Sequence, residues 1–279
     1  MTISKTINIG IKILQEANVL DAIIDARLLL MHKLNCDRNY IILNGEKDID
    51  EQIYLDYLSL INRRKCHEPL QYITNSQEFM GLEFFVDNRV LIPRQDTEIL
   101  VENIIEFSKQ HTLRTGIEIG VGSGCISISL VRFIKGLAMT SCDISSDAIA
   151  VAKFNATKHN CEINFIKSDI LRNMPHIAVD FIVSNPPYIP KDEYNTLELE
   201  VYREPHIALS DNADGLSFYR NIATTGYDFL KKGGFIALEI GYNQGQDVID
   251  ILKSAGYLEI RLILDYNKKD RVVFARKGE

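Results

Sequence analysis

The feature that most constrains the fold is a regular alternation of apolar strand-like runs and helical stretches after residue 96. The runs lie at about residues 115–119, 137–142, 163–167, 180–184 and 235–240. Such alternation is typical of an α/β fold whose parallel sheet is covered by helices on both faces. Two further runs, 257–264 and 271–276, are joined without a helix, so they are expected to form an antiparallel hairpin. The sequence therefore predicts a seven-stranded sheet with one reversed strand.

The first seventy residues have a different pattern, because apolar side chains there repeat at helical spacing, as at Ile7, Ile11 and Leu14. Residues 35–50 carry the turn residues and charges of a connecting stretch. Short apolar runs over 71–86 predict a β-hairpin. We expect an N-terminal helical bundle domain over 1–72, a β-hairpin linker over 73–95 and the α/β domain over 96–279.

A glycine-rich loop follows the first strand of the α/β domain and precedes a helix. Its residues are Glu118, Gly120, Val121, Gly122, Ser123 and Gly124. Glycines at alternate positions let the backbone turn sharply and bring its N–H groups against a nucleoside. The spacing is G-x-G-x-G, which leaves less room for a pyrophosphate than a dinucleotide loop does. The alternative is a loop that serves only tight packing.

Two carboxylates follow the next two strands of the predicted sheet. Asp143 lies about twenty residues after the glycines, where an acidic ligand of a ribose is expected. Asp169, followed by Ile170, ends the next strand and could accept from the exocyclic amine of adenine. Asp143 could alternatively do no more than open a turn before the helix that starts near Ser145. Because ligands bind outside the carboxyl ends of parallel strands, these strand ends together predict a nucleoside site.

A rigid polar turn, Asn185, Pro186, Pro187 and Tyr188, follows the apolar run that ends at Ser184. The Asn185 side-chain oxygen and a backbone carbonyl of the prolines can accept hydrogen bonds from a substrate NH₂ group. Proline limits the flexing of such a turn, and Tyr188 could pack on a planar amide. The alternative is a proline-stiffened surface loop. With the glycine loop upstream, the turn predicts methyl transfer to a planar amide or amine nitrogen.

The glycine loop, Asp143, Asp169 and the Asn-Pro-Pro-Tyr turn resemble the signature of class I S-adenosylmethionine-dependent methyltransferases, which have a Rossmann-like sheet. Further segments resemble the peptide chain release factor N5-glutamine methyltransferase family. They are Arg63–Arg64, Glu68–Ile73, Leu91–Glu98, Glu204–Pro205 with Ala208–Leu209, and Asp265–Tyr266 before Arg271–Val272. The resemblance runs from about residue 60 to the C-terminus.

This resemblance implies that S-adenosyl-L-methionine is the cofactor and that class I release factors are the protein substrate. The methyl acceptor would be the glutamine of their Gly-Gly-Gln loop, so the activity would support translation termination. Asn185, Pro186, Pro187 and Tyr188 would be catalytic, and the helical domain would help hold the release factor. Arg94 and Glu204 would line the substrate entrance, or alternatively form an ion pair between loops. Three departures are Glu118, where the family often has Asp, Ile170, where many members have an aromatic residue, and 201–203, where the order of the arginine and the aromatic residue differs from that in some members.

Composition narrows the class of protein. The formal net charge of −7 disfavours long nucleic acid as the main partner, since phosphate binding depends on clustered Lys and Arg. Five cysteines without a C-x-x-C pair suggest neither disulfides nor a zinc site, and we expect no metal. No apolar run reaches membrane-spanning length and no signal peptide pattern is present. We therefore expect a cytoplasmic enzyme that does not bind membranes.

Four alternatives to this function stay open at this point. A glutamine methyltransferase of a ribosomal protein would have the same catalytic residues. An adenine amino methyltransferase of nucleic acid would use a similar turn, but it would have to hold a flipped base and a phosphate backbone. A non-catalytic protein could keep the cofactor site and bind a release factor. Dinucleotide-dependent redox chemistry is the remaining alternative.

Overall fold

The structure, a computed structural model, describes residues 1–278 and divides the chain into two units. The helical unit comprises Met1–Ser76 together with Glu198–Arg203. The α/β unit comprises Gln77–Leu197 and the described residues from Glu204 onward. A short segment from the second half of the chain therefore belongs to the helical unit.

The helical unit is built from five helices around one apolar core. They are α1 (Ile3–Glu16), α2 (Ala22–Leu34), α3 (Arg38–Leu43), α4 (Glu51–Lys65) and α5 (Leu70–Thr74). Leu14, Leu29 and Ile61 are fully buried where α1, α2 and α4 meet. Arg64 is also buried, and its guanidinium binds Asp25 at 2.6 Å and Glu200. These ion pairs join the segment 198–203 to the helices of this unit.

Helix α3 corrects the expectation that residues 35–50 only connect two helices. Asp37 caps its first turn, because the Asp37 carboxylate accepts a hydrogen bond from the Tyr40 backbone N–H at 2.8 Å. Ile41 then turns inward and is buried in the core. In the sequence alone, Asp37 could equally be a turn residue, so it does not distinguish a helix from a loop. The helix becomes evident only in the structure, where Ile41 is buried in the core.

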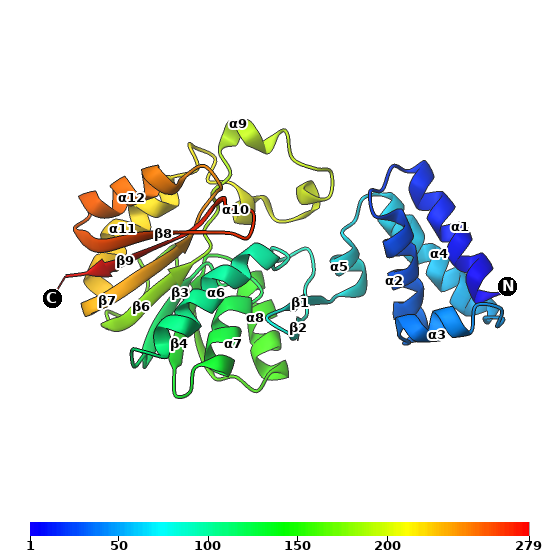
Figure 1. Cartoon of the computed structure of the whole chain (residues 1–279), viewed down its shortest axis with the longest axis horizontal. Helices are drawn as coiled ribbons and strands as arrows, with labels where there is room; N and C mark the ends of the chain where they lie inside the picture. Colours follow the sequence, from blue (N-terminus) through cyan, green and yellow to red (C-terminus); the bar gives the residue numbers. More distant parts are fainter. Residues whose placement is uncertain (279) are drawn as a thin grey trace. The chain divides into compact units, whose positions relative to one another are not determined.

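The α/β unit contains a seven-stranded sheet with the order β5-β4-β3-β6-β7-β9-β8 (Figure 1). Its strands are β3 (Thr115–Ile119), β4 (Ala138–Asp143), β5 (Ile163–Lys167), β6 (Val179–Ser184), β7 (Leu230–Glu239), β8 (Tyr257–Leu264) and β9 (Asp270–Lys277). Strands β3 to β7 pair in parallel, whereas β9 is antiparallel to both β7 and β8. The predicted sheet with one reversed strand is confirmed.

Helices cover both faces of this sheet, as Figure 1 shows. One face carries α6 (Gln95–Ser108), α7 (Cys125–Phe133) and α8 (Ser146–Lys158). The other carries α11 (Ser217–Phe229) and α12 (Gly245–Ser254). Phe181 and Phe235 face the first group of helices, and Ile182 and Ile236 face the second. Strand β6 and the second half of β7 are thus buried on both sides, as their apolar runs predict.

Shorter elements surround the sheet. The hairpin expected over 71–86 starts later and consists of β1 (Gln77–Phe79) and β2 (Leu82–Phe84). Residues 70–74 form the helix α5 instead. After β6 the chain forms α9 (Lys191–Tyr194), a 3-10 helix (Val201–Arg203) and α10 (His206–Leu209). Among the described residues, no helix is both long and apolar enough to cross a membrane.

The strand order creates a topological switch point between β3 and β6. The chain passes from β3 outward to β4 and β5, and then returns to place β6 on the other side of β3. Ile119 pairs with Ser184 at the carboxyl ends of these two strands. The loops that leave β3 and β6 therefore separate there, which is where open parallel sheets bind ligands.

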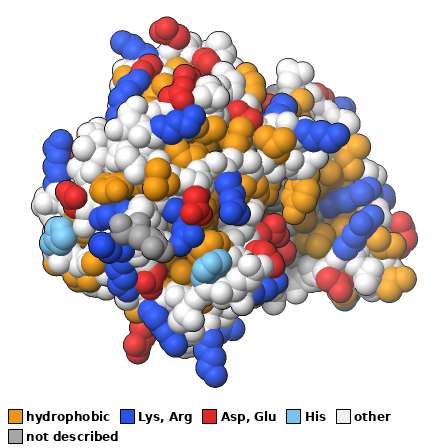
Figure 2. Space-filling model, turned by 60° about the vertical axis from the view of Figure 1, so that its left-hand side comes forward, with side chains coloured by type: hydrophobic (Ala, Val, Ile, Leu, Met, Phe, Trp, Pro, Cys, Tyr) orange, Lys and Arg blue, Asp and Glu red, His pale blue; other side chains and the backbone are white. Residues whose placement is uncertain are grey.

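One face of the molecule is drawn in space-filling form in Figure 2. On that face, Lys and Arg side chains are interspersed with Asp and Glu side chains. A face of mixed charge lacks the uniform positive potential with which proteins attract long nucleic acid.

Candidate active site

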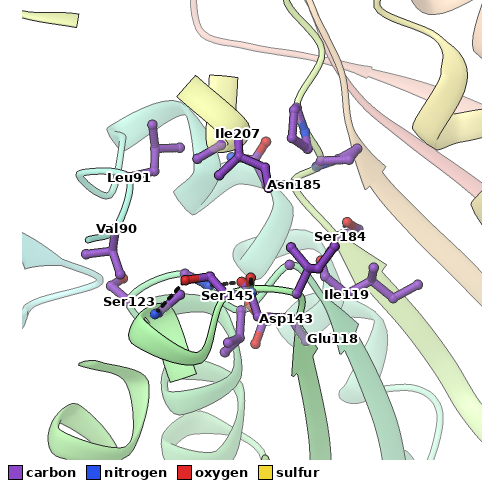
Figure 3. A pocket seen from close by; sticks show the side chains of 18 of the residues that line it. Val90, Leu91, Glu118, Ile119, Ser123, Asp143, Ser145, Ser184, Asn185 and Ile207 are labelled. Carbon is purple, nitrogen blue, oxygen red and sulfur yellow. Dashed lines mark hydrogen bonds between the residues drawn. The ribbon is translucent and has the colours of Figure 1, made fainter. Parts of the chain in front are cut away.

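A cavity lies in the α/β unit at the carboxyl ends of its parallel strands. Loops that follow β3, β4, β5 and β6 supply one part of its wall. The segment before α6 and the short helix α10 supply another part, as Figure 3 shows for Val90, Leu91 and Ile207. In the same view, Glu118 and Asp143 lie at the strand ends and Asn185 lies near Ile207. The cavity therefore lies at the strand ends where the sequence predicts a nucleoside site.

The glycine loop leaves β3 through backbone conformations that favour glycine. Gly122 has φ of 52°, and a Cβ at that position would meet open space, so the requirement there is conformational. Gly124 has φ of 84°, and a Cβ there would lie 3.2 Å from the Cβ of Ala152 on α8. The first glycine gives the loop its turn, and the second allows α7 and α8 to approach each other.

Asp143 is held by backbone N–H groups from two loops. Its carboxylate accepts hydrogen bonds from the Gly122 N–H at 3.1 Å and from the Ser145 N–H at 2.9 Å. Burial raises the pKa of Asp143 above its usual range, although these N–H groups oppose that rise. The carboxylate also lines the cavity, so its remaining lone pairs can accept from a ligand hydroxyl.

Glu118 is a buried carboxyl that faces the cavity from the end of β3. The Ser127 hydroxyl donates a hydrogen bond to its Oε2 atom, and the Ser141 hydroxyl does so at 3.2 Å. Its Oε1 atom has no hydrogen-bond partner within the described part of the chain. Burial raises the pKa of Glu118 to about 8. An unpartnered buried oxygen in a cavity wall is suited to a polar ligand group, because burying it alone is unfavourable.

Asp169 and Ile170 line the cavity from the loop after β5. The Asp169 carboxylate forms an ion pair with Arg172 at 2.7 Å. Ile170 has φ of 53°, a rare conformation for a β-branched residue, and its carbonyl accepts a hydrogen bond from the Cys142 thiol at 3.1 Å. Strain of this kind persists where the surroundings fix a side chain at a functional position.

The Asn-Pro-Pro-Tyr turn begins at the end of β6. The Ser184 hydroxyl donates to the Ile119 carbonyl at 2.7 Å, which ties this strand end to β3. The Asn185 side-chain N–H donates to the Thr97 hydroxyl on α6 at 3.2 Å. Asn185, Pro186 and Pro187 line the cavity. Tyr188 instead packs against the core on the α11 side, and the Gln244 amide donates to its carbonyl at 3.0 Å.

Arg94 and Glu204 form an ion pair within the α/β unit. The Arg94 side chain is 41% exposed and lines the cavity, whereas the Glu204 side chain is 2% exposed. Glu204 also accepts a hydrogen bond from the Ile92 backbone N–H at 2.9 Å. This pair therefore fixes the segment before α6 against the segment before α10.

The cavity brings together most of the residues singled out in the sequence. Those in its wall are Arg94, Glu118, Gly120, Val121, Gly122, Ser123, Asp143, Asp169, Ile170, Asn185, Pro186 and Pro187. Within the described chain, Gly124, Tyr188 and Glu204 are outside the cavity wall. Sequence reasoning gave no role to Thr97, which also lines the cavity, or to Glu239, which is buried at the end of β7. A signal for Glu239 exists, because this charged residue directly follows the buried apolar run 235–238.

The strand order, the reversed β9 and the cavity at the switch point define a class I methyltransferase fold. A solved methyltransferase from Pyrococcus furiosus shares it with a TM-score of 0.53 and 17% identity, over 72% of this chain and 91% of that one. Residues 6–74 match the family described as PrmC N-terminal domain, and residues 94–203 match the methyltransferase small domain.

Two relatives extend the likeness over nearly the whole chain. A release factor glutamine methyltransferase of Clostridium acetobutylicum is 40% identical over 95% of each chain. Another, of Fusobacterium nucleatum, is 38% identical over 97% of this chain and 78% of its own length. The chain belongs to the release factor glutamine methyltransferase family.

Proposed function

We propose that this chain transfers a methyl group from S-adenosyl-L-methionine to the side-chain nitrogen of the glutamine in the Gly-Gly-Gln loop of class I peptide chain release factors. The observation that most supports this is that Asn185 lines the same cavity as Gly122 and Asp143. A turn able to bind an NH₂ group thus opens onto the expected nucleoside site. The reaction would serve translation termination in the cytoplasm.

The residues of the cavity fit the cofactor in chemistry. Asp143 offers acceptor lone pairs for the two ribose hydroxyls, and Asp169 offers them for the adenine amine. Ile170 offers an apolar side chain for the adenine face. Glu118 has a buried oxygen without a partner, which suits the ammonium group of the methionine part. Gly120 and Gly122 allow the backbone to lie close to the ligand.

S-adenosylmethionine, when bound, supplies the methyl group on a positively charged sulfonium that is its own leaving group. The protein must orient a carboxamide nitrogen, which is a poor nucleophile because its lone pair is delocalised into the carbonyl. The Asn185 side-chain oxygen and the Pro186 carbonyl can each accept a hydrogen bond from the substrate NH₂. Such bonds fix the rotation of the amide and favour positive charge as it develops on nitrogen.

We also propose that the N-terminal helical domain, residues 1–72, helps to hold the release factor. This domain leaves large apolar side chains in water, including Leu20, between α1 and α2, at 84% exposure and Leu43, at the end of α3, at 83%. Large exposed apolar side chains are typical of protein contact sites when they gather on one surface. A Leu43→Asp variant is expected to raise KM for the release factor while leaving the affinity for the cofactor unchanged.

The test of the main proposal is transfer of labelled methyl from S-adenosylmethionine to a purified class I release factor. Label is expected with the normal factor and is expected to disappear when the loop glutamine is changed to Ala. Asn185→Ala is expected to abolish transfer, whereas Asn221→Ala, on an exposed part of α11, should leave it unchanged. Label on a ribosomal protein or on DNA, with none on the release factor, would overturn the choice of substrate. Cofactor binding without any transfer would indicate a non-catalytic binder.

A further inference from the structure

The Gln244 side chain, in the loop between β7 and α12, binds two other loops of the α/β unit. Its Oε1 atom accepts a hydrogen bond from the Gly241 backbone N–H of its own loop at 2.9 Å. Its Nε2 group donates to the Tyr188 carbonyl at 3.0 Å and to the Gly215 carbonyl at 3.3 Å. Tyr188 ends the Asn-Pro-Pro-Tyr turn, and Gly215 lies just before α11. Gln244 is buried, so water has little access to these contacts.

The partners of Gln244 allow only one orientation of its amide. A backbone N–H only donates and a backbone carbonyl only accepts. The Gly241 N–H therefore requires the amide oxygen, and the carbonyls of Tyr188 and Gly215 require the NH₂ group. A flipped amide would set its oxygen against both carbonyls, with no hydrogen between them. The two N–H donors of Gln244 are thus committed to the two carbonyls.

The Asn-Pro-Pro-Tyr turn depends on anchors from other parts of the chain. Its two prolines have no backbone N–H, so they cannot donate hydrogen bonds that would hold the turn. The first residue of the turn is held by its side chain, because Asn185 donates to the Thr97 hydroxyl at 3.2 Å. The last residue is held at two places, since Gln244 binds the Tyr188 carbonyl and the Tyr188 ring packs against the core on the α11 side.

We propose that Gln244 is a positioning residue, which fixes the Tyr188 carbonyl and thereby keeps the Pro186 carbonyl directed toward the substrate NH₂. This inference rests on the proposed function, in which the Pro186 carbonyl and the Asn185 oxygen orient the reacting amide. Within the described chain, Gln244 is outside the cavity wall, so it acts through the turn. Its loss should therefore lower kcat, which depends on how the amide nitrogen is aimed at the methyl group, and leave the affinity for the cofactor unchanged.

Gly215 gives a second way to disturb the same carbonyl. It has φ of 79°, and a Cβ there would lie 2.5 Å from the Tyr188 carbonyl oxygen and 2.8 Å from the Gln244 Nε2 atom. An alanine at this position must therefore displace the end of the turn. Gly233, in the first half of β7, has φ of 70°, but the nearest atom to its Cβ would be on the Arg276 guanidinium at 3.5 Å. Gly215→Ala and Gly233→Ala thus carry similar backbone strain, and only the first pushes on the turn.

Gln244→Met keeps the length of the side chain and removes its hydrogen-bonding groups. We expect kcat per molecule of bound S-adenosylmethionine to fall by about tenfold or more in Gln244→Met and in Gly215→Ala. Dividing by bound cofactor removes any loss of folded protein, which a purely structural role would cause. Gln246→Met, on an exposed part of α12, and Gly233→Ala should stay within about twofold of the wild type. Equal kcat values in either variant and its control would overturn the proposal.

The double variant with Gln244→Met and Gly215→Ala tests whether both changes act through the Tyr188 carbonyl. Once one change has freed or displaced this carbonyl, the other has less left to disturb. We therefore expect the loss of kcat in the double variant to be smaller than the product of the two single losses. Losses that multiply would show two independent effects and would contradict a shared action on the turn.

A measurement that needs no activity separates this inference from the proposed function. In protein labelled with ¹⁵N-glutamine, the Gln244 NH₂ signals can be assigned from their loss in Gln244→Met. We expect them to exchange with water about tenfold or more slowly than those of the exposed Gln246, and to shift in Gly215→Ala but not in Gly233→Ala. Exchange as fast as that of Gln246 would overturn the inference. Wild-type protein that shows the slow exchange but methylates no release factor would instead overturn the proposed function.

Discussion

The Gly122 backbone N–H donates a hydrogen bond to the Asp143 carboxylate at 3.1 Å. This contact ties the loop after β3 to the loop after β4, and the Ser145 N–H completes it at 2.9 Å. Two fixed N–H groups hold the carboxylate in one orientation before any ligand arrives. A preorganised acceptor of this kind loses little conformational entropy on binding.

Asp143→Ala should therefore weaken the binding of S-adenosylmethionine by about 10- to 100-fold, since it removes the acceptor that we propose for the ribose hydroxyls and the anchor of Gly122. Titration calorimetry measures the effect directly. Asp250→Ala, on the exposed side of α12, is the control and should bind as the wild type does. An unchanged affinity in Asp143→Ala would show that this carboxylate only closes its own turn.

Glu118 predicts how stability depends on pH. Native Glu118 keeps its proton up to a pKa of about 8, whereas an unfolded glutamate loses it near 4.5. The native state then binds more protons between these values, so Glu118 lowers the stability of the protein as pH rises through this window. Glu118→Gln, which cannot ionise, should gain about 2–4 kcal/mol in free energy of unfolding relative to wild type between pH 5 and 9.

Urea unfolding at several pH values measures this difference. Glu106→Gln is a suitable control, because the Glu106 side chain is 63% exposed and its loss should give no such trend. A gap between wild type and Glu118→Gln that does not grow with pH would contradict the argument. The Glu118→Gln variant should keep part of the decline in stability with rising pH, because burial also raises the pKa of Glu239 to about 7.

Asn155 on α8 joins the glycine loop to the segment after β2. Its side chain donates to the Ser123 and Phe85 carbonyls, each at 2.9 Å, and accepts from the Phe85 N–H at 2.8 Å. Asn155→Ala leaves these partners unsatisfied, so a loss of about 2–4 kcal/mol in free energy of unfolding is expected. Asn221→Ala should change it by less than about 0.5 kcal/mol. Similar values for both variants, measured by urea unfolding, would mean that water replaces Asn155.

The sheet could be predicted from the sequence because most of its strands contain runs rich in apolar residues, which in β6 are buried on both faces. Polar or glycine residues flank these runs, and β3, β5 and β8 have the predicted bounds. The connection between β8 and β9 is too short to contain a helix, which likewise predicted that these two strands are antiparallel. Local sequence signals were sufficient for those parts of the fold that depend on the hydrophobic periodicity of a segment and on the length of the loop between two strands.

The hydrogen bond from Asn185 to Thr97 could not be predicted in this way. Asn185 follows strand β6 and Thr97 lies in the first turn of helix α6, and only the fold brings these two residues together. Tyr188 shows the converse, because its place next to Asn185 suggested a position in the cavity, whereas it packs on the core. Side-chain direction in a proline-rich turn depends on what the rest of the chain places around it.

Arg94 and Glu204 give the last prediction, which decides between the two roles considered for them. Removing Arg94 takes away a cation that binds a buried carboxylate, so Arg94→Ala should lower the free energy of unfolding by about 1–3 kcal/mol. Adding Glu204→Gln removes the buried charge and keeps an acceptor for the Ile92 N–H, so the double variant should be more stable than Arg94→Ala alone. Activity then separates the roles. If the pair only fixes two loops, KM for the release factor should recover along with stability in the double variant. Because Arg94 is 41% exposed and lines the cavity, we expect KM to stay raised by about threefold or more, which would assign Arg94 to substrate binding. Full recovery of KM would assign it to the ion pair alone.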